Sequence, residues 1–192
     1  MIPLLALIRR HESGDDYNSI SHFVPRKYYP RDHVSTLTIG QILQVQEAWR
    51  SRGVKSTAIG SYQFIYKTLR GLYTSAGLTA QSKFGPKAQD KLAMALLERR
   101  GLSDWQSGQI DDDAFMLGLA KEWASFPVPY DVNGKRRGQS YYAGDDMNKA
   151  LVSVEDVQGA LDASRTQSPQ TGLVALIRAI LAFLGRILGA KQ

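Results

Sequence analysis

The chain has 192 residues and a formal net charge of +6, with 24 lysines and arginines against 18 aspartates and glutamates. This length suits one domain of ordinary size with room for a short appendage. There is no cysteine, which excludes disulfide bonds and thiolate metal sites, and the apolar fraction of 43% is that of a globular protein. The positive charge favours an anionic partner: nucleic acid, an anionic membrane or the bacterial cell wall.

An apolar segment at the start of the chain leads to a single glutamate. Residues 2–8 are dense in leucine and isoleucine and predict a buried helix, and Gly14 stands where a helix ends in the left-handed conformation. Glu12 then lies in the last turn of this helix. Partial burial and the negative end of the helix dipole both disfavour the carboxylate form, so we expect a raised pKa, as a general acid requires. The competing interpretation is an ordinary surface glutamate.

The next elements are predicted from turn residues and helix caps. Prolines, aspartates and asparagine at residues 15–37 favour loops and short strands. Thr38 and Gln41 form a capping-box pattern, which predicts a helix over residues 39–50. A further helix is expected over about residues 65–76.

Two later helices are predicted from their first residues. Gly85 and Pro86 open one of them, because proline is tolerated at the first helical position, and Gly101 ends it. The acidic run at residues 111–113 begins the other, which is expected to continue to about Ser125. These predictions indicate a mainly helical fold.

The remaining chain divides at a polar linker. Residues 127–144 are predicted as a basic, glycine-containing loop, and a short pair of helices at 145–161 closes the first domain. Residues 162–171, rich in serine, glutamine and threonine, predict a linker, and residues 172–192 a separate tail. The expected fold class is therefore mainly α, a helical bundle with a small β-hairpin or loop region over residues 1–161.

The tail is predicted to form a cationic amphipathic helix. On a helical wheel, Arg178 and Arg186 share one side with small residues, and large apolar residues including Phe183 and Leu184 cover the opposite face. Such a helix lies in a membrane interface, with these four residues in contact with the membrane. The alternatives are a last helix packed on the domain and a membrane span, although an arginine near the bilayer centre costs about 2.5–3.5 kcal/mol.

Several short motifs, taken together, resemble a known family. They are Glu12-Ser13-Gly14, Lys55-Ser56-Thr57, Gly60 with Tyr62-Gln63, Gly85 to Asp90, Trp123 to Pro127, and Gly138 to Asp145. In this order and spacing, over roughly residues 5–150, they resemble the lambda-type phage endolysins, soluble lytic transglycosylases with a lysozyme-like fold. The resemblance implies an α+β lysozyme-like fold and places Glu12 where that family has its catalytic acid.

The resemblance implies cleavage of the β-1,4 bond between N-acetylmuramic acid and N-acetylglucosamine in peptidoglycan, with Glu12 as the single acid and base and a 1,6-anhydro product. Cleavage of a glycosidic bond needs an acid for the leaving oxygen, and ordinary glycosidases need a second carboxylate. T4-type lysozymes have an aspartate nine residues after the glutamate, where this chain has Ser21. Asp15 and Asp16 are expected to form turns. If folding brings Asp32 near Glu12, the chain is a muramidase with reducing-end products; a basic cell-wall-binding module is the non-enzymatic alternative.

Six residues are candidates for binding the sugar chain. The candidates are Ser56, Tyr62, Gln63, Trp123, Tyr141 and Tyr142. Tyr62 and Gln63 match positions that line the cleft of lysozyme-like transglycosylases, and a carboxamide both donates to and accepts from sugar groups. Tyr141 and Tyr142 are candidates for a stacking platform at the cleft mouth. In the competing interpretation Tyr62 and Trp123 are core aromatics or cleft wall and Ser56 is a turn residue.

No metal or cofactor is expected. His11, His22 and His33 are eleven residues apart, which matches no metal-ligand pattern, and His11 is expected to point to another side of the helix from Glu12 as a structural residue. Without a nucleic-acid-binding motif, no nucleic-acid partner is expected either. The expected partners are peptidoglycan and, through residues 172–192, an anionic membrane.

The sequence also predicts where the protein acts. Arg9 and Arg10 follow the first apolar segment rather than precede it, so no cleavable signal peptide is expected. The protein would be made in the host cytoplasm, would act as a monomer in the periplasm and cell wall, and would reach them through a holin or in a virion.

Overall fold

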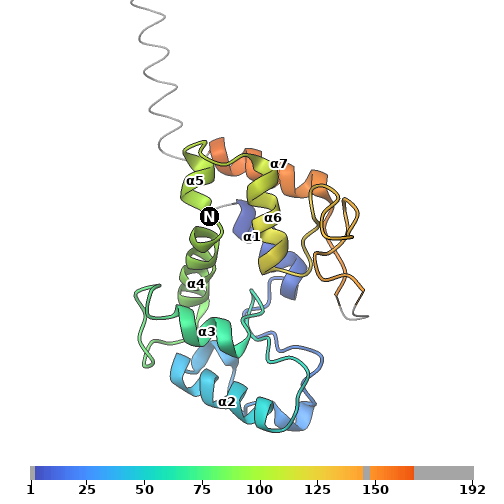
Figure 1. Cartoon of the computed structure of the whole chain (residues 1–192). Coiled ribbons are helices and arrows are strands. Elements are labelled where there is room, and N and C mark those ends of the chain that lie inside the picture. The colour runs from blue at the N-terminus through green and yellow to red at the C-terminus, as the bar shows by residue number, and fades with distance from the viewer. Residues whose placement is uncertain (1–2, 145–147, 167–192) are drawn as a thin grey trace, which may run out of the picture.

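The computed structural model describes residues 3–144 and 148–166 (Figure 1). Within these ranges the α-helices are α1 (Pro3–Ser13), α2 (Ile39–Ser51), α3 (Tyr66–Leu72), α4 (Pro86–Arg99), α5 (Leu102–Gln106), α6 (Asp112–Glu122) and α7 (Val154–Thr166), with 3-10 helices η1 (Arg26–Tyr28) and η2 (Val34–Thr36). The β-structure of the same ranges consists of isolated bridges, such as those of Ile59 with Phe64 and Pro127 with Ser140. The predicted mainly helical fold is confirmed.

The helices form two groups, which α4 connects (Figure 1). In one group α2 packs against α3, and in the other α1, α5, α6 and α7 pack against one another. One end of α4 lies beside α3, and α4 also contacts α1 and α5. Helix α1 is joined to α7: the two helices pack along each other, and the Leu4 N–H donates to the Ser164 hydroxyl at 3.4 Å.

Several helices begin or end at the residues that short sequence motifs predicted. The Thr38 hydroxyl accepts a hydrogen bond from the Gln41 N–H, and the Gln41 side chain accepts one from the Thr38 N–H, which completes the capping box of α2. Gly85 precedes α4 and Pro86 is its first residue. Gly14, at φ +65°, follows α1 in the left-handed conformation that glycine adopts most readily.

Helix α3 is shorter than predicted, because it ends at Leu72 rather than near Ala76. The Ser75 hydroxyl donates to the Leu72 carbonyl at 2.8 Å, a bond by which a serine side chain competes with the helical backbone pattern. Helix α6 likewise ends at Glu122, three residues before the predicted end at Ser125. The short helix α5 was not predicted at all.

The helix pair predicted at residues 145–161 is wrong. Residues 148–153 are not helical, and the described residues that follow form one helix, α7, which begins at Val154. Its start is set by Ser153, whose hydroxyl accepts a hydrogen bond from the Asp156 N–H at 3.0 Å. Helix α7 continues to Thr166, so it runs past the domain boundary predicted at residue 161 and into the predicted linker.

A buried carboxamide fixes the segment that will line the site. The Gln46 side chain of α2 is fully buried, and its Nε2 donates to the carbonyl oxygens of Thr57 and Phe64, both at 2.8 Å. Bonds to two carbonyls on either side of a turn hold the turn in one conformation. The segment between Thr57 and Phe64 is therefore a rigid part of the group that contains α2.

No helix in the described ranges is long and apolar enough to cross a membrane. The predicted tail helix at residues 172–192, with Arg178, Phe183, Leu184 and Arg186, lies outside the described residues, as does the second half of the predicted linker. The membrane-contacting role of the tail stays a prediction.

Candidate active site

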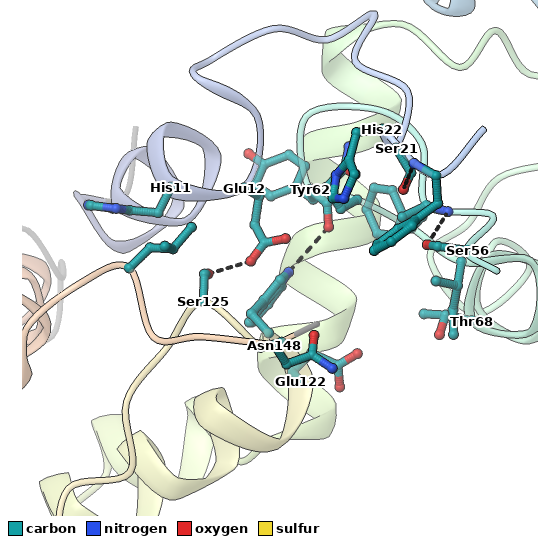
Figure 2. A pocket seen from close by; sticks show the side chains of 18 of the residues that line it. His11, Glu12, Ser21, His22, Ser56, Tyr62, Thr68, Glu122, Ser125 and Asn148 are labelled. Carbon is teal, nitrogen blue, oxygen red and sulfur yellow. Dashed lines mark hydrogen bonds between the residues drawn. The ribbon is translucent and has the colours of Figure 1, made fainter. Parts of the chain in front are cut away.

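A pocket of about 490 Å³ has walls from both groups of helices (Figure 2). The ends of α1 and α6 contribute to it, together with α3 and α4. The rest of the wall comes from residues within the segments 21–23, 56–65, 123–125 and 148–151. Glu12 lines this pocket, at the end of α1.

The Glu12 carboxyl group has an environment suited to holding a proton. Burial raises the pKa of Glu12 from 4.5 to about 7, and hydrogen bonds from the hydroxyl and the backbone of Ser125 oppose this rise. Figure 2 shows the carboxyl group turned toward Ser125, whose hydroxyl donates to its Oε1. The raised pKa expected from the sequence is confirmed, with burial as its main cause. Near neutral pH both forms of Glu12 are populated, so the group can give a proton and take one back.

Glu122 is the other carboxylate among the described residues that line the pocket. Its side chain is 7% exposed and pairs with two arginines, at 2.9 Å to Arg99 and 2.7 Å to Arg100. Both carboxylate oxygens accept hydrogen bonds from these guanidinium groups, so neither is available to activate a water molecule or to attack the sugar. Glu122 is thus neutralised in this arrangement.

The structure does not bring the other candidate carboxylates into the pocket. Asp15 accepts from Arg9 at 3.2 Å, and Asp16 accepts from the Asn18 N–H at 2.8 Å, so both hold the turn after α1, as predicted. Asp32, the predicted second carboxylate of a muramidase, is exposed and does not line the pocket. Ser21 does line it, at the position where T4-type lysozymes have an aspartate.

Four of the six predicted sugar-binding residues, Ser56, Tyr62, Gln63 and Trp123, line the pocket. Gln63 has a left-handed backbone at φ +51°, and its carboxamide nitrogen donates to the Gly60 carbonyl at 2.8 Å. Tyr62 and Trp123 are also core residues, 1% and 3% exposed, and the Trp123 indole donates to the Tyr62 carbonyl at 3.3 Å. Their buried rings form the wall and floor of the pocket.

The other two, Tyr141 and Tyr142, are not among the residues that line the pocket. Their rings meet edge to face at 5.3 Å, and the Tyr142 hydroxyl donates to the Lys121 carbonyl at 2.7 Å. The pair therefore braces the loop after α6 against α6, and its predicted stacking on sugar stays a prediction.

Several pocket residues were not predicted. His22 and Phe23 line the pocket with their ring centroids 3.9 Å apart, and Ser125, Asn148 and Lys149 line it as well. The local sequence signals among them are the adjacent aromatic rings of His22 and Phe23 and the position of Ser125 within the motif from Trp123 to Pro127.

His11 also lines the pocket, although the sequence indicated a structural role on another side of the helix. Figure 2 shows its ring directed away from the Glu12 carboxyl group. No group of three or more histidine, aspartate or glutamate side chains in the described part of the chain is arranged to hold a metal ion.

A model of the Endolysin family matches residues 44–153, more than half of the chain. The matched range covers the pocket wall from Ser56 to Leu151, and Glu12 precedes it. No curated protein and no solved structure matches the chain. The chain belongs to the Endolysin family and is a phage enzyme that degrades the bacterial cell wall.

Proposed function

We propose that this endolysin is a lytic transglycosylase of the lysozyme-like superfamily, in which Glu12 serves as both acid and base. Its substrate is the bond between N-acetylmuramic acid and N-acetylglucosamine in peptidoglycan. One observation carries the proposal: Glu12 has a pKa of about 7 in a pocket whose other described carboxylate, Glu122, is paired with Arg99 and Arg100.

The reaction takes place in two proton transfers at the Glu12 carboxyl group. The protonated group first gives its proton to the glycosidic oxygen, the bond from C1 of muramic acid to that oxygen breaks, and N-acetylglucosamine leaves with a free hydroxyl. The resulting carboxylate then takes the proton of the muramic acid C6 hydroxyl, whose oxygen forms a bond to C1. The product is a 1,6-anhydro sugar, no water is consumed, and Glu12 ends protonated as it began.

The proposed route requires that the pKa of Glu12 lie near the working pH, and the pKa of about 7 fits this requirement. An ordinary glutamate is almost fully ionised at neutral pH and gives no proton. A pKa near the working pH maximises proton transfer in both directions. The hydrogen bond from Ser125 orients the carboxyl group without fixing it in the ionised form, because burial outweighs that bond.

The pocket also provides groups for a polar sugar chain. The Gln63 carboxamide is oriented by its bonds to Gly60 and Ser19, and Ser56 lies on the same wall. The paired rings of His22 and Phe23 offer an apolar surface for a sugar face. Four predicted residues and this pair together form a binding surface of the kind expected for a carbohydrate.

The experiment is mass spectrometry of the fragments that the full chain releases from purified peptidoglycan. Fragments ending in anhydro-muramic acid, one water lighter than reducing ends, are the expected result. Reducing ends would overturn the transglycosylase and make the chain a muramidase, with Glu122 as the first residue to test.

Three variants complete the design. Glu12→Gln should release no fragments while still binding the wall; a Glu12→Gln variant that still releases fragments would exclude Glu12 as the acid. Asp32→Asn serves as the matched control, since Asp32 is exposed and outside the pocket, and it should give the wild-type products. Glu122→Gln should also leave the type of product unchanged.

A further inference from the structure

A polar cluster behind the pocket is centred on Asp90 of α4. Its Oδ1 accepts hydrogen bonds from the hydroxyls of Tyr17 at 2.8 Å and Tyr62 at 2.6 Å. The Arg9 guanidinium lies 3.9 Å from the same oxygen and 3.5 Å from the Tyr62 hydroxyl. One carboxylate oxygen thus joins α4 to α1, to the turn after α1 and to the segment that lines the pocket.

The neighbouring residue Gln89 fixes the same segments through its fully buried side chain. Its Oε1 accepts from the Ser61 N–H at 2.7 Å, and its Nε2 donates to the carbonyls of Tyr17 at 3.0 Å and Phe84 at 2.8 Å. Both N–H groups and the oxygen of this carboxamide thus form hydrogen bonds within the protein. Gln89 and Asp90 are neighbours in α4, and both form hydrogen bonds to Tyr17 and to the segment that contains Ser61 and Tyr62.

Both segments held by this pair carry residues of the pocket. Arg9 lies three residues before Glu12 on α1, about one helical turn. Tyr62 directly precedes Gln63, and the hydroxyls of Ser13 and Ser61 meet at 3.0 Å between the two segments. The distance between Glu12 and Gln63 is thus set by contacts that converge on α4.

We propose that Asp90 is a positioning residue for the reaction: through Tyr17 and Tyr62 it fixes the end of α1 that carries Glu12 against the turn that carries Gln63. The inference rests on the proposed function. Asp90 does not line the pocket, so it acts through the two tyrosines and not on the substrate. The pKa of Tyr17 is raised to about 12, mainly by burial, so its hydroxyl keeps the proton that it donates to Asp90.

Two substitutions of Asp90 separate its hydrogen bonds from its charge. Asp90→Ala and Asp90→Asn both remove the negative charge, but only asparagine keeps an oxygen where the tyrosine hydroxyls donate. We expect Asp90→Ala to lower kcat by on the order of 10- to 100-fold, as misplacement of a catalytic group does. Asp90→Asn should restore most of this loss.

The pH dependence of kcat gives a second readout. Burial is the main cause of the raised pKa of Glu12, so a loosened α1 end should move the alkaline limb of the profile from about pH 7 toward lower pH. The other ionisable groups of the pocket are His11, His22, Tyr62, Glu122 and Lys149, which are identical in both variants. The difference between the two profiles therefore reports position rather than charge.

Asp112 provides a matched control in a similar cluster away from the pocket. It accepts from the Trp105 indole at 2.7 Å and the Gln158 carboxamide at 2.6 Å, and it pairs with Arg165. Asp112→Ala should lower the melting temperature without moving the pH profile. If Asp90→Ala does not fold, Tyr17→Phe removes one donor to Asp90 at a residue that does not line the pocket, keeps the ring, and should shift kcat and the profile in the same direction.

The outcomes separate this inference from the proposed function. A loss of kcat and a shifted profile in Asp90→Ala, with recovery in Asp90→Asn, support the positioning role. Equal behaviour of the two variants, or an Asp90→Ala profile like that of Asp112→Ala, overturns it. An active Glu12→Gln variant would refute the proposed function instead, whatever the result at Asp90.

Discussion

The hydroxyl of Ser125 donates a hydrogen bond to the carboxyl group of Glu12 across 113 residues of sequence. The contact joins the end of α1 to the loop that follows α6, and both residues line the pocket. It favours the ionised form of Glu12, whereas burial favours the protonated form. The pKa of about 7 is the balance of these two effects, so each of them can be tested by itself.

Ser125→Ala should move the alkaline limb of the pH–rate profile to higher pH. The substitution removes the side-chain hydrogen bond that stabilises the carboxylate, while burial of Glu12 remains, so its pKa should rise above 7. The measurement is initial rate on solubilised peptidoglycan from pH 5 to 9. Ser125→Thr keeps a hydroxyl and serves as the control; an unchanged limb in Ser125→Ala would show that the bond has no part in setting the pKa.

Glu12→Gln should stabilise the protein at alkaline pH but not at acidic pH. The pKa of Glu12 is about 7 in the folded state and 4.5 as a free group, so the folded state binds the proton more tightly. The wild type therefore loses stability as pH rises from about 4.5 to 7, and the cost is fully present above pH 7. The gain of the variant at pH 8 should be about 3 kcal/mol, since each pKa unit of this difference corresponds to about 1.4 kcal/mol. Urea unfolding at pH 4.5 and pH 8 measures it, and a gain independent of pH would contradict the burial of this charge.

Glu122→Gln should destabilise the fold without changing the type of product. The change leaves Arg99 and Arg100 without their shared carboxylate, and because Glu122 is 7% exposed the cost should be about 1–3 kcal/mol. Glu47→Gln is the matched control, since the pair of Glu47 with Arg50 is exposed on α2 and is worth less than about 1 kcal/mol. Thermal unfolding compares the two variants. Equal stability losses would show that Glu122 is not the buried ion-pair partner described here.

Gly60→Ala should destabilise the pocket wall, whereas Gly71→Ala should stabilise the protein. Gly60 has φ +78°, and an added Cβ would lie 2.5 Å from Oε1 of Gln89 and 2.9 Å from the Phe84 ring. Strain and overpacking together should cost about 2–4 kcal/mol. Gly71 lies in α3 with nothing near the added atom, so its replacement should gain about 0.5–1 kcal/mol. Chemical unfolding tests both, and a tolerated Gly60→Ala would mean that Gln89 can move.

Neutralising the tail should weaken membrane contact and leave the enzyme intact. The sequence predicts that Arg178 and Arg186 lie on one side of an amphipathic helix that binds anionic lipid, each worth about 1 kcal/mol near the surface. The double change to glutamine should reduce binding to vesicles containing phosphatidylglycerol, by cosedimentation, and leave the rate on purified peptidoglycan unchanged. Unaltered vesicle binding would remove the membrane role from the tail.

The sequence predicted the features that depend on neighbouring residues. Gly14 after α1, the capping box of Thr38 and Gln41, and Pro86 at the start of α4 are all signals contained within a few positions of the chain. The raised pKa of Glu12 also followed, because it requires only that a helix be buried up to its last turn.

The sequence could not predict the features that depend on contacts between residues far apart in the chain. Nothing near Ser125 indicates a contact with Glu12, and nothing near Asp90 indicates that Tyr17 and Tyr62 will donate to it. We predicted a structural role for His11, because adjacent residues of a helix point to different sides. The pocket is nevertheless wide enough for both His11 and Glu12 to line it. Helix α5, at five residues, is too short for periodicity to reveal.

The packing of α1 against α7 has a consequence for synthesis. Because synthesis runs from α1 toward α7, the helix that packs along α1 is made well after α1 itself. Leu4, Leu5 and Ile8 of α1 are buried in the folded protein, and until α7 has been made this apolar side is only partly covered. We therefore expect a chain truncated before Val154 to leave this side of α1 exposed to water and to fold less stably.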